Sequence, residues 1–84
     1  MKIEQKIIMK RINDLCKKEG ISYYTLSDKS GVPMSTLMHL VNGTVKNPGI
    51  FTIVRICNGF GITLAEFFDT EAFHSMVKGA NIEG

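Results

Sequence analysis

The sequence predicts a small all-α protein, and three observations support this prediction. Apolar residues recur at steps of three to five positions along several segments, which is the spacing of a helix with one buried face. No segment alternates apolar and polar residues as a half-buried strand does. Hydrophobic residues make up 44% and charged residues 21% of the 84 residues, a composition typical of a folded domain. The chain is therefore expected to form one compact helical domain.

The first helix is predicted over residues 3–19, and Gly20 ends it. Its apolar face is formed by Ile3, Ile7, Ile8, Ile12 and Leu15. Six basic and two acidic side chains lie in residues 1–18, whereas residues 66–84 contain one basic and four acidic side chains. The net charge is only +2, but it is unevenly distributed along the chain. The basic first part is therefore suited to face a polyanion, whereas the acidic last part is not.

A tight turn is predicted between a second and a third helix. Ser22 is a good N-cap for a helix over residues 23–30, and Gly31 stands where a residue with positive φ would close it. Pro33 suits the first turn of the third helix, because a residue there needs no N–H donor, and this helix is expected to extend to Asn42. The two segments thus have the spacing of a helix-turn-helix.

The segment from Ser27 to Leu37 is the most informative part of the chain. Ser27 is small, as a close crossing of the two helices requires, and Gly31 permits the turn that sets them at roughly 90–120°. Leu37 and its apolar neighbours hold that angle by packing. The third helix is then left with an outward face of Met34, Ser35, Met38, His39 and Asn42. The major groove of B-DNA, about 12 Å wide, admits one such helix.

Two more helices complete the five that the sequence predicts. Asn47 and Pro48 are interpreted as a cap and a first-turn proline of a strongly apolar fourth helix that ends at Gly59 or Gly61. Residues 63–66, T-L-A-E, form a capping box that opens a short fifth helix. We expect residues 1–69 to form the helix-turn-helix domain and residues 70–84 a C-terminal extension, either a short helix or a flexible tail.

Several other classes of protein are not expected. No apolar run approaches the roughly 18 residues that span a bilayer, and no signal peptide precedes the first helix, so a cytoplasmic protein without a membrane partner is expected. Cys16 and Cys57 lack metal-like spacing and are interpreted as buried small hydrophobes. His39 and His74 are isolated, and no nucleophile, paired carboxylate or phosphate loop points to catalysis. Neither an enzyme nor a cofactor is expected.

The segment G-I-S-Y-Y-T-L-S-D-K-S-G-V-P-M-S-T-L-M-H-L-V-N-G, followed by N-P and A-E-F-F, resembles the Cro/C1-type (XRE-like) helix-turn-helix family, which includes phage repressors. The resemblance covers residues 6–69 and includes the predicted fourth and fifth helices. It implies a compact, lambda-repressor-like DNA-binding domain that binds double-stranded DNA. The expected function is transcriptional regulation, with repression by occlusion of an operator.

The resemblance also implies which residues contact DNA. The base-reading positions of the third, or recognition, helix are Met34, Ser35, Thr36, Met38 and His39. The positions that contact phosphate are Tyr23, Asn42, Thr44, Lys46 and Asn47. Two methionines stand where arginine or glutamine is common in the family, so contacts to thymine methyls are expected in place of bidentate hydrogen bonds. Cys16 and Val41 replace an internal arginine–glutamate pair of some members.

A homodimer on a palindromic operator is expected, because members of this class gain affinity from two half-sites roughly 34 Å apart. Its candidate contacts are Phe67, Phe68, Phe73, Met76 and Val77, although Phe67 and Phe68 are also candidates for closing the core. Two other functions remain open. One is an antitoxin that regulates its own operon and binds a toxin, and the other is a protein-interaction module that has lost DNA binding. No inducer pocket is predicted.

Overall fold

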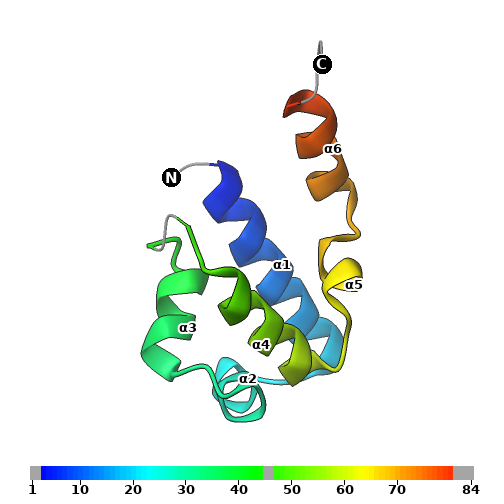
Figure 1. Cartoon of the computed structure of the whole chain (residues 1–84). Coiled ribbons are helices and arrows are strands. Elements are labelled where there is room, and N and C mark those ends of the chain that lie inside the picture. The colour runs from blue at the N-terminus through cyan, green and yellow to red at the C-terminus, as the bar shows by residue number, and fades with distance from the viewer. Residues whose placement is uncertain (1–2, 45–46, 81–84) are drawn as a thin grey trace.

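The computed structural model describes residues 3–44 and 47–80, and in these ranges every regular element is a helix. The elements are α1 (Ile3–Glu19), α2 (Tyr23–Ser30), α3 (Met34–Val41), α4 (Ile50–Phe60), α5 (Leu64–Phe68) and α6 (Glu71–Ala80) (Figure 1). The all-α prediction is confirmed. The sixth helix lies in the segment for which the sequence left a short helix or a flexible tail open.

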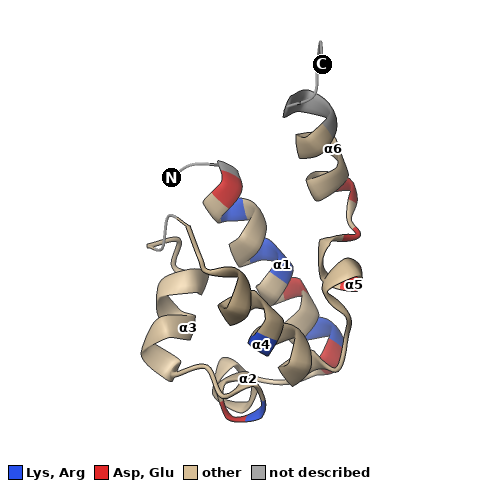
Figure 2. Cartoon of the chain, viewed as in Figure 1, with Lys and Arg blue, Asp and Glu red and all other residues tan. Residues whose placement is uncertain are grey.

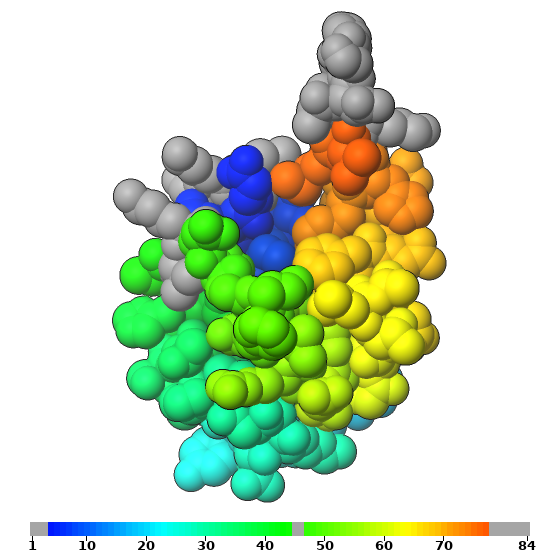
Figure 3. Space-filling view, in the orientation of Figure 1, coloured from blue at the N-terminus to red at the C-terminus, as the bar shows by residue number. Residues whose placement is uncertain are grey.

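The first five helices form the body of the molecule, and α6 projects from it. α2 lies at one end of the body, whereas α6 extends beyond the other end, on the same side as the first turns of α1 (Figures 1 and 3). α2 packs against both α3 and α4, and α1 packs against α3. No helix in the described residues is long and apolar enough to cross a membrane.

The core is a single apolar cluster to which each of the first five helices contributes. Its completely buried side chains are Ile12, Leu26, Leu37, Ile56 and Phe67. Complete burial of such a side chain contributes about 1.5–3 kcal/mol to folding. Cys16 and Cys57 are free thiols within this cluster, as expected. Phe67 therefore closes the core and is not available as a dimer contact.

The ends of α1 and α4 and the start of α5 lie where the sequence predicted them. Gly20 follows α1 with a φ of 67°, and Gly61 ends α4 with a φ of 72°. At α5, the Thr63 N–H donates to Glu66 Oε1 over 2.8 Å, and the Glu66 N–H donates to Thr63 Oγ1 over 3.0 Å. This is the predicted capping box. The pKa of Glu66 is lowered, first because the backbone N–H of Thr63 donates to the Glu66 carboxylate and second because the Thr63 side chain also favours its charged form.

The two proline-based predictions are corrected by one position or more. Pro33 occupies the N-cap of α3 and accepts the N–H of Leu37 over 3.0 Å, so it precedes the first turn. α4 begins later than predicted, because Gly49 is its N-cap and accepts the N–H of Thr52 over 3.1 Å. Pro48 therefore lies outside the helix. At the other end of α3, residue 42 is the C-cap.

α2 and α4 approach each other closely at Gly59, to which the sequence analysis assigned no packing role. A Cβ atom at this position would lie 2.8 Å from the Cβ of Ser30 and 3.1 Å from the Cδ1 of Leu26. Real side chains do not pack at the first of these distances, so only glycine fits here without a shift of α2. Since α2 carries the turn into α3, this contact helps to position the recognition helix.

Candidate nucleic-acid interface

α2, the helix that precedes the turn, is capped at both of its ends. Ser22 Oγ accepts the N–H of Thr25 over 3.1 Å at the start of α2. At the end of α2, Gly31 adopts a φ of 76° and its N–H donates to the Ser27 carbonyl over 3.0 Å. The prediction of a left-handed glycine that closes α2 is confirmed.

Val32 anchors this turn through both of its backbone polar groups. Ser27 Oγ donates to the Val32 carbonyl over 2.6 Å, and the Val32 N–H donates to Ser30 Oγ over 3.1 Å. The Val32 side chain is buried in the core. A buried backbone group without a partner is costly, so the two serines fix the direction in which the chain enters α3.

α3 presents one apolar and one polar side. Leu37 and Leu40 are buried in the core, and Met34 is half-buried and packs against it. Ser35 and His39 are exposed. These two residues are four positions apart, so their side chains lie on the same side of the helix, one turn from each other. Thr36 and Met38 are half-buried and border this surface.

The residues that follow α3 are also accessible. The side chains of Asn42 and Thr44 are exposed, and the Thr44 N–H donates to the His39 carbonyl over 2.9 Å. Asn47 is exposed and borders a cavity on the α1 and α4 side of the molecule. Lys46, which the resemblance assigned to phosphate, lies outside the described residues.

Tyr23 is half-buried at the start of α2, and its hydroxyl is already engaged. The hydroxyl donates to Asn13 Oδ1 over 2.8 Å. Burial is the main cause that raises the pKa of Tyr23, and the nearby Cys16 raises it further. The Tyr23 oxygen remains an acceptor, so donation from Tyr23 to a phosphate requires the bond to Asn13 to be exchanged.

With this geometry established, the chain was compared with known proteins. A model of the Cro/C1-type HTH DNA-binding domain matches residues 11–72. The chain belongs to this family. The match starts within α1, includes α2 through α5 and ends at the beginning of α6. No curated protein and no solved structure matched the chain.

Family membership makes this chain a DNA-binding domain, and its charge pattern is unusual for that function. Between residues 30 and 54 the only ionisable Lys, Arg, Asp or Glu side chain is Lys46. Figure 2 accordingly shows α3 without any coloured charge, whereas α1 carries several basic residues. α3 therefore carries no Lys, Arg, Asp or Glu side chain of its own.

Two basic residues that the residue-by-residue comparison with the family did not assign lie beside the end of α3. Lys6 and Lys10 line a shallow groove together with Asn13 and Tyr23, and Val41 at the end of α3 completes its wall. The lysines are four positions apart on α1, so their spacing already places them on one face. Lys10 also pairs with Asp14 over 2.8 Å at an exposed site. This groove places two cations of the Cro/C1-type domain next to its recognition helix.

Arg11, by contrast, is half-buried and is directed to the end of α5. Its Nε donates to the Phe67 carbonyl over 2.6 Å, and its Nη2 donates to the Glu66 carbonyl over 2.7 Å. Its guanidinium carbon lies 5.8 Å from the centre of the Phe67 ring. Charged donors at the last carbonyls of a helix stabilise that end. Arg11 therefore attaches α5 to α1.

Proposed function

We propose that this Cro/C1-type domain recognises a specific DNA duplex by placing α3 in the major groove, and that it acts as a transcriptional repressor by occluding its operator. The observation that carries the proposal is the exposed pair Ser35 and His39, one helical turn apart on a helix whose entry angle is fixed by the Ser27 and Ser30 hydrogen bonds. α3 therefore presents two exposed polar side chains, which we assign to contacts with base edges.

The chemistry of α3 sets the kind of readout. Ser35 can donate to or accept from a base edge, and His39 can donate to a guanine acceptor in either protonation state. Met38 and Thr36 supply methyl groups that suit contact with thymine. Since the described part of the recognition helix has no arginine, we expect a larger share of the specificity to come from the shape and deformability of the duplex.

Backbone contacts are proposed to lie on both sides of α3. Lys6 and Lys10 on α1 supply charge on one side, and Asn42 and Thr44 supply hydrogen-bonding groups after the helix. Tyr23, Lys46 and Asn47 remain proposed phosphate contacts from the family resemblance. Two to four neutralised phosphates per protomer correspond to a slope of about −2 to −4 in a plot of log affinity against log salt.

We further propose a homodimer on two half-sites about one helical turn, roughly 34 Å, apart. Because Phe67 is buried, the contacts between protomers are assigned to the region of α6, where the Val77 side chain is 68% exposed. Phe68, Phe73 and Met76 are half-buried and are less available. A bound dimer of this kind covers promoter DNA that polymerase needs.

Selection of duplexes from a random pool by the full chain tests the proposal. The expected result is an enriched site with twofold symmetry, bound at least tenfold more tightly than a scrambled duplex at the same salt concentration. Enrichment of no sequence, together with no retardation of any duplex at low salt, would contradict specific DNA recognition. That outcome would favour a protein-interaction module with this fold, for which the uncharged surface of α3 is the supporting observation.

A further inference from the structure

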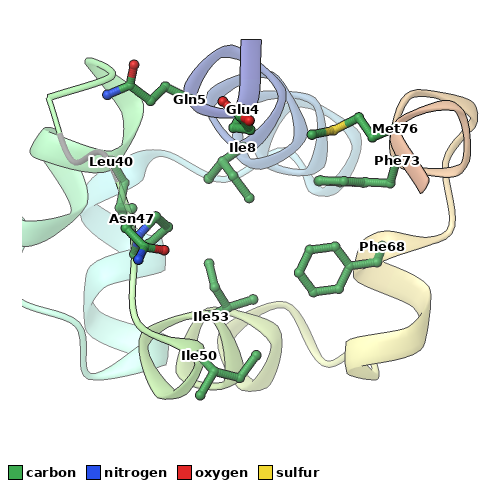
Figure 4. Close-up of a pocket in the computed structure, with 11 residues that line it drawn as sticks. Glu4, Gln5, Ile8, Leu40, Asn47, Ile50, Ile53, Phe68, Phe73 and Met76 are labelled. Carbon is green, nitrogen blue, oxygen red and sulfur yellow. The ribbon is translucent and has the colours of Figure 1, made fainter. Parts of the chain in front are cut away.

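A cavity of about 500 Å³ lies between the body of the molecule and α6, and no sequence pattern predicted it. α1, α4, α5 and α6 form most of its wall, and Leu40 of α3 and the segment before α4 complete it (Figure 4). Its volume falls within the roughly 300–1,000 Å³ that is typical of small-molecule sites. Figure 3 shows the hollow between α1, the start of α4 and the α5–α6 region.

The residues that line this cavity are mostly apolar and come from several helices. Ile8 on α1 and Ile53 on α4 point toward each other across the space, and Ile50 lies at its edge (Figure 4). Phe68 and Phe73 close one side, with their ring centres 4.8 Å apart in an edge-to-face arrangement. Such a combination of aliphatic and aromatic walls suits an apolar group of the size of a substituted ring.

Among the described residues that line the cavity, Glu4 is the only charged one. Glu4 is exposed and stands one helical turn before Ile8, on the same face of α1. A ligand with its apolar part against Ile8 therefore brings its polar end to a carboxylate. The described lining contains no basic side chain that would attract an anion.

We propose that this cavity binds a small amphipathic cation, with the apolar part between Ile8, Ile53 and Phe73 and the positive group beside Glu4. The size of the cavity favours a small molecule over a helix of a second copy. An α-helix with its side chains is about 10–12 Å wide, so a cavity of this volume holds only about one turn of it.

Two lining residues connect the cavity to the recognition helix. Leu40 belongs to the last turn of α3, and Pro48 belongs to the segment that joins α3 to α4. A ligand that packs against both Leu40 and Pro48 contacts the end of the recognition helix, and a ligand that prefers one arrangement of a site changes the affinity at a linked site. This effector role rests on the proposed DNA interface, whereas binding of the cation does not.

The binding test uses the full chain and two probes of equal shape, 4-phenylbutylamine and 4-phenylbutanol, titrated while the methyl signals of the isoleucines are followed by NMR. We expect saturable shifts of the Ile8, Ile50 and Ile53 methyls, and an amine that binds about three- to fivefold more tightly than the alcohol, as one exposed charge pair allows. Absence of saturable shifts at these methyls overturns the proposal, as does equal binding of the two probes.

Matched variants separate the charge from the cavity. Glu4→Gln is expected to remove the preference for the amine, whereas Glu19→Gln, which changes an exposed carboxylate on the same helix outside the cavity, is expected to keep it. Met76→Trp fills the cavity from the projecting helix and is expected to weaken both probes at least tenfold, with folding checked by circular dichroism. An unchanged preference in Glu4→Gln, or unchanged affinity in Met76→Trp, overturns the assignment.

The effector role has its own readout, which is the affinity for the selected duplex with and without saturating 4-phenylbutylamine. We expect a change of at least threefold that butylamine at the same concentration does not produce and that Met76→Trp abolishes. Identical changes with butylamine overturn the coupling while leaving the cation site intact. If the same isoleucine methyls shift on concentration of the protein without any probe, a second copy occupies the cavity and the proposal is wrong.

Discussion

Ser27 Oγ lies 2.6 Å from the Val32 carbonyl oxygen, to which it donates a hydrogen bond. This bond spans the left-handed Gly31 and joins the last turn of α2 to the residue that precedes Pro33 at the start of α3. The direction of the recognition helix is therefore set by a side chain on α2 as well as by the glycine between the two helices.

Ser27→Ala is expected to lower the free energy of unfolding by about 1–2 kcal/mol, because the Val32 carbonyl then loses its side-chain donor. Urea denaturation measures the change. Ser75→Ala, at an exposed position on α6, is the control and should change it by less than about 0.5 kcal/mol. Equal stability of the two variants would show that the Ser27 bond does not stabilise the turn.

Gly59→Ala is expected to destabilise the protein by about 1–3 kcal/mol, because its new Cβ would lie 2.8 Å from the Cβ of Ser30 and would push α2 away from α4. Gly49→Ala is the matched control. Its Cβ would meet nothing nearer than 4.0 Å, and its φ of −67° is open to alanine. Thermal unfolding of both variants makes the comparison, and a Gly59→Ala variant as stable as Gly49→Ala would contradict the close approach.

Arg11 and Lys10 are neighbours in the sequence, but the structure predicts different effects for their removal. Arg11→Met should lower the free energy of unfolding by about 1.5–3 kcal/mol, since two charge-assisted hydrogen bonds to α5 are lost. Lys10→Ala should weaken binding to all duplexes alike and reduce the salt slope by about 1. Denaturation and binding at several salt concentrations distinguish the two effects, and a reduced salt slope for folded Arg11→Met would contradict its structural assignment.

The raised pKa values of Cys16, Cys57 and Tyr23 predict that the protein loses stability at high pH. Burial raises the pKa of both Cys16 and Cys57 above the usual value of a thiol, and it raises the pKa of Tyr23 as well. A raised pKa means that the unfolded state loses its proton first, so the stabilisation is complete below the ordinary thiol pKa and is lost as the pH rises toward the folded pKa. Denaturation between pH 7 and about 10.5 should show this decrease.

Substitution of both cysteines identifies the thiol part of this effect. The double variant Cys16→Ala, Cys57→Ala should show a shallower decrease with pH than the natural chain, whatever its stability at pH 7. In the natural chain, both thiols should react with a disulfide reagent at pH 8 far more slowly than after unfolding, because only the thiolate reacts. Rapid reaction of the folded chain would contradict the burial of these residues.

The sequence allowed prediction of features that depend on a few adjacent residues. Ser22, Gly31 and the capping box at Thr63 each act within one turn of helix, so local chemistry was sufficient to place the ends of α2 and α5. The order of the first five helices and the outward positions of Ser35 and His39 followed from periodicity and the family resemblance.

Features that depend on distant parts of the chain were not predicted. Arg11 reaches carbonyls 55 and 56 positions away, and the Tyr23 hydroxyl selects Asn13 on another helix. The start of α4 was misplaced because Asn47 and Pro48 have the composition of a helix start, whereas the backbone of Gly49 accepts the first hydrogen bond. The cavity exists only once α6 projects beside α1 and α4, an arrangement that no local pattern encodes.

Affinities for the selected duplex and for its single-base variants decide whether Ser35 and His39 read bases. Ser35→Ala and His39→Ala should each weaken binding to the preferred site by about 1–3 kcal/mol and relax specificity at one position of each half-site. Ser75→Ala and His74→Ala, which change the same residue types on α6, should leave the specificity at every base position unchanged. If the α3 variants lost the same affinity on every duplex, or if neither lost any affinity, Ser35 and His39 would not be the residues that read the bases.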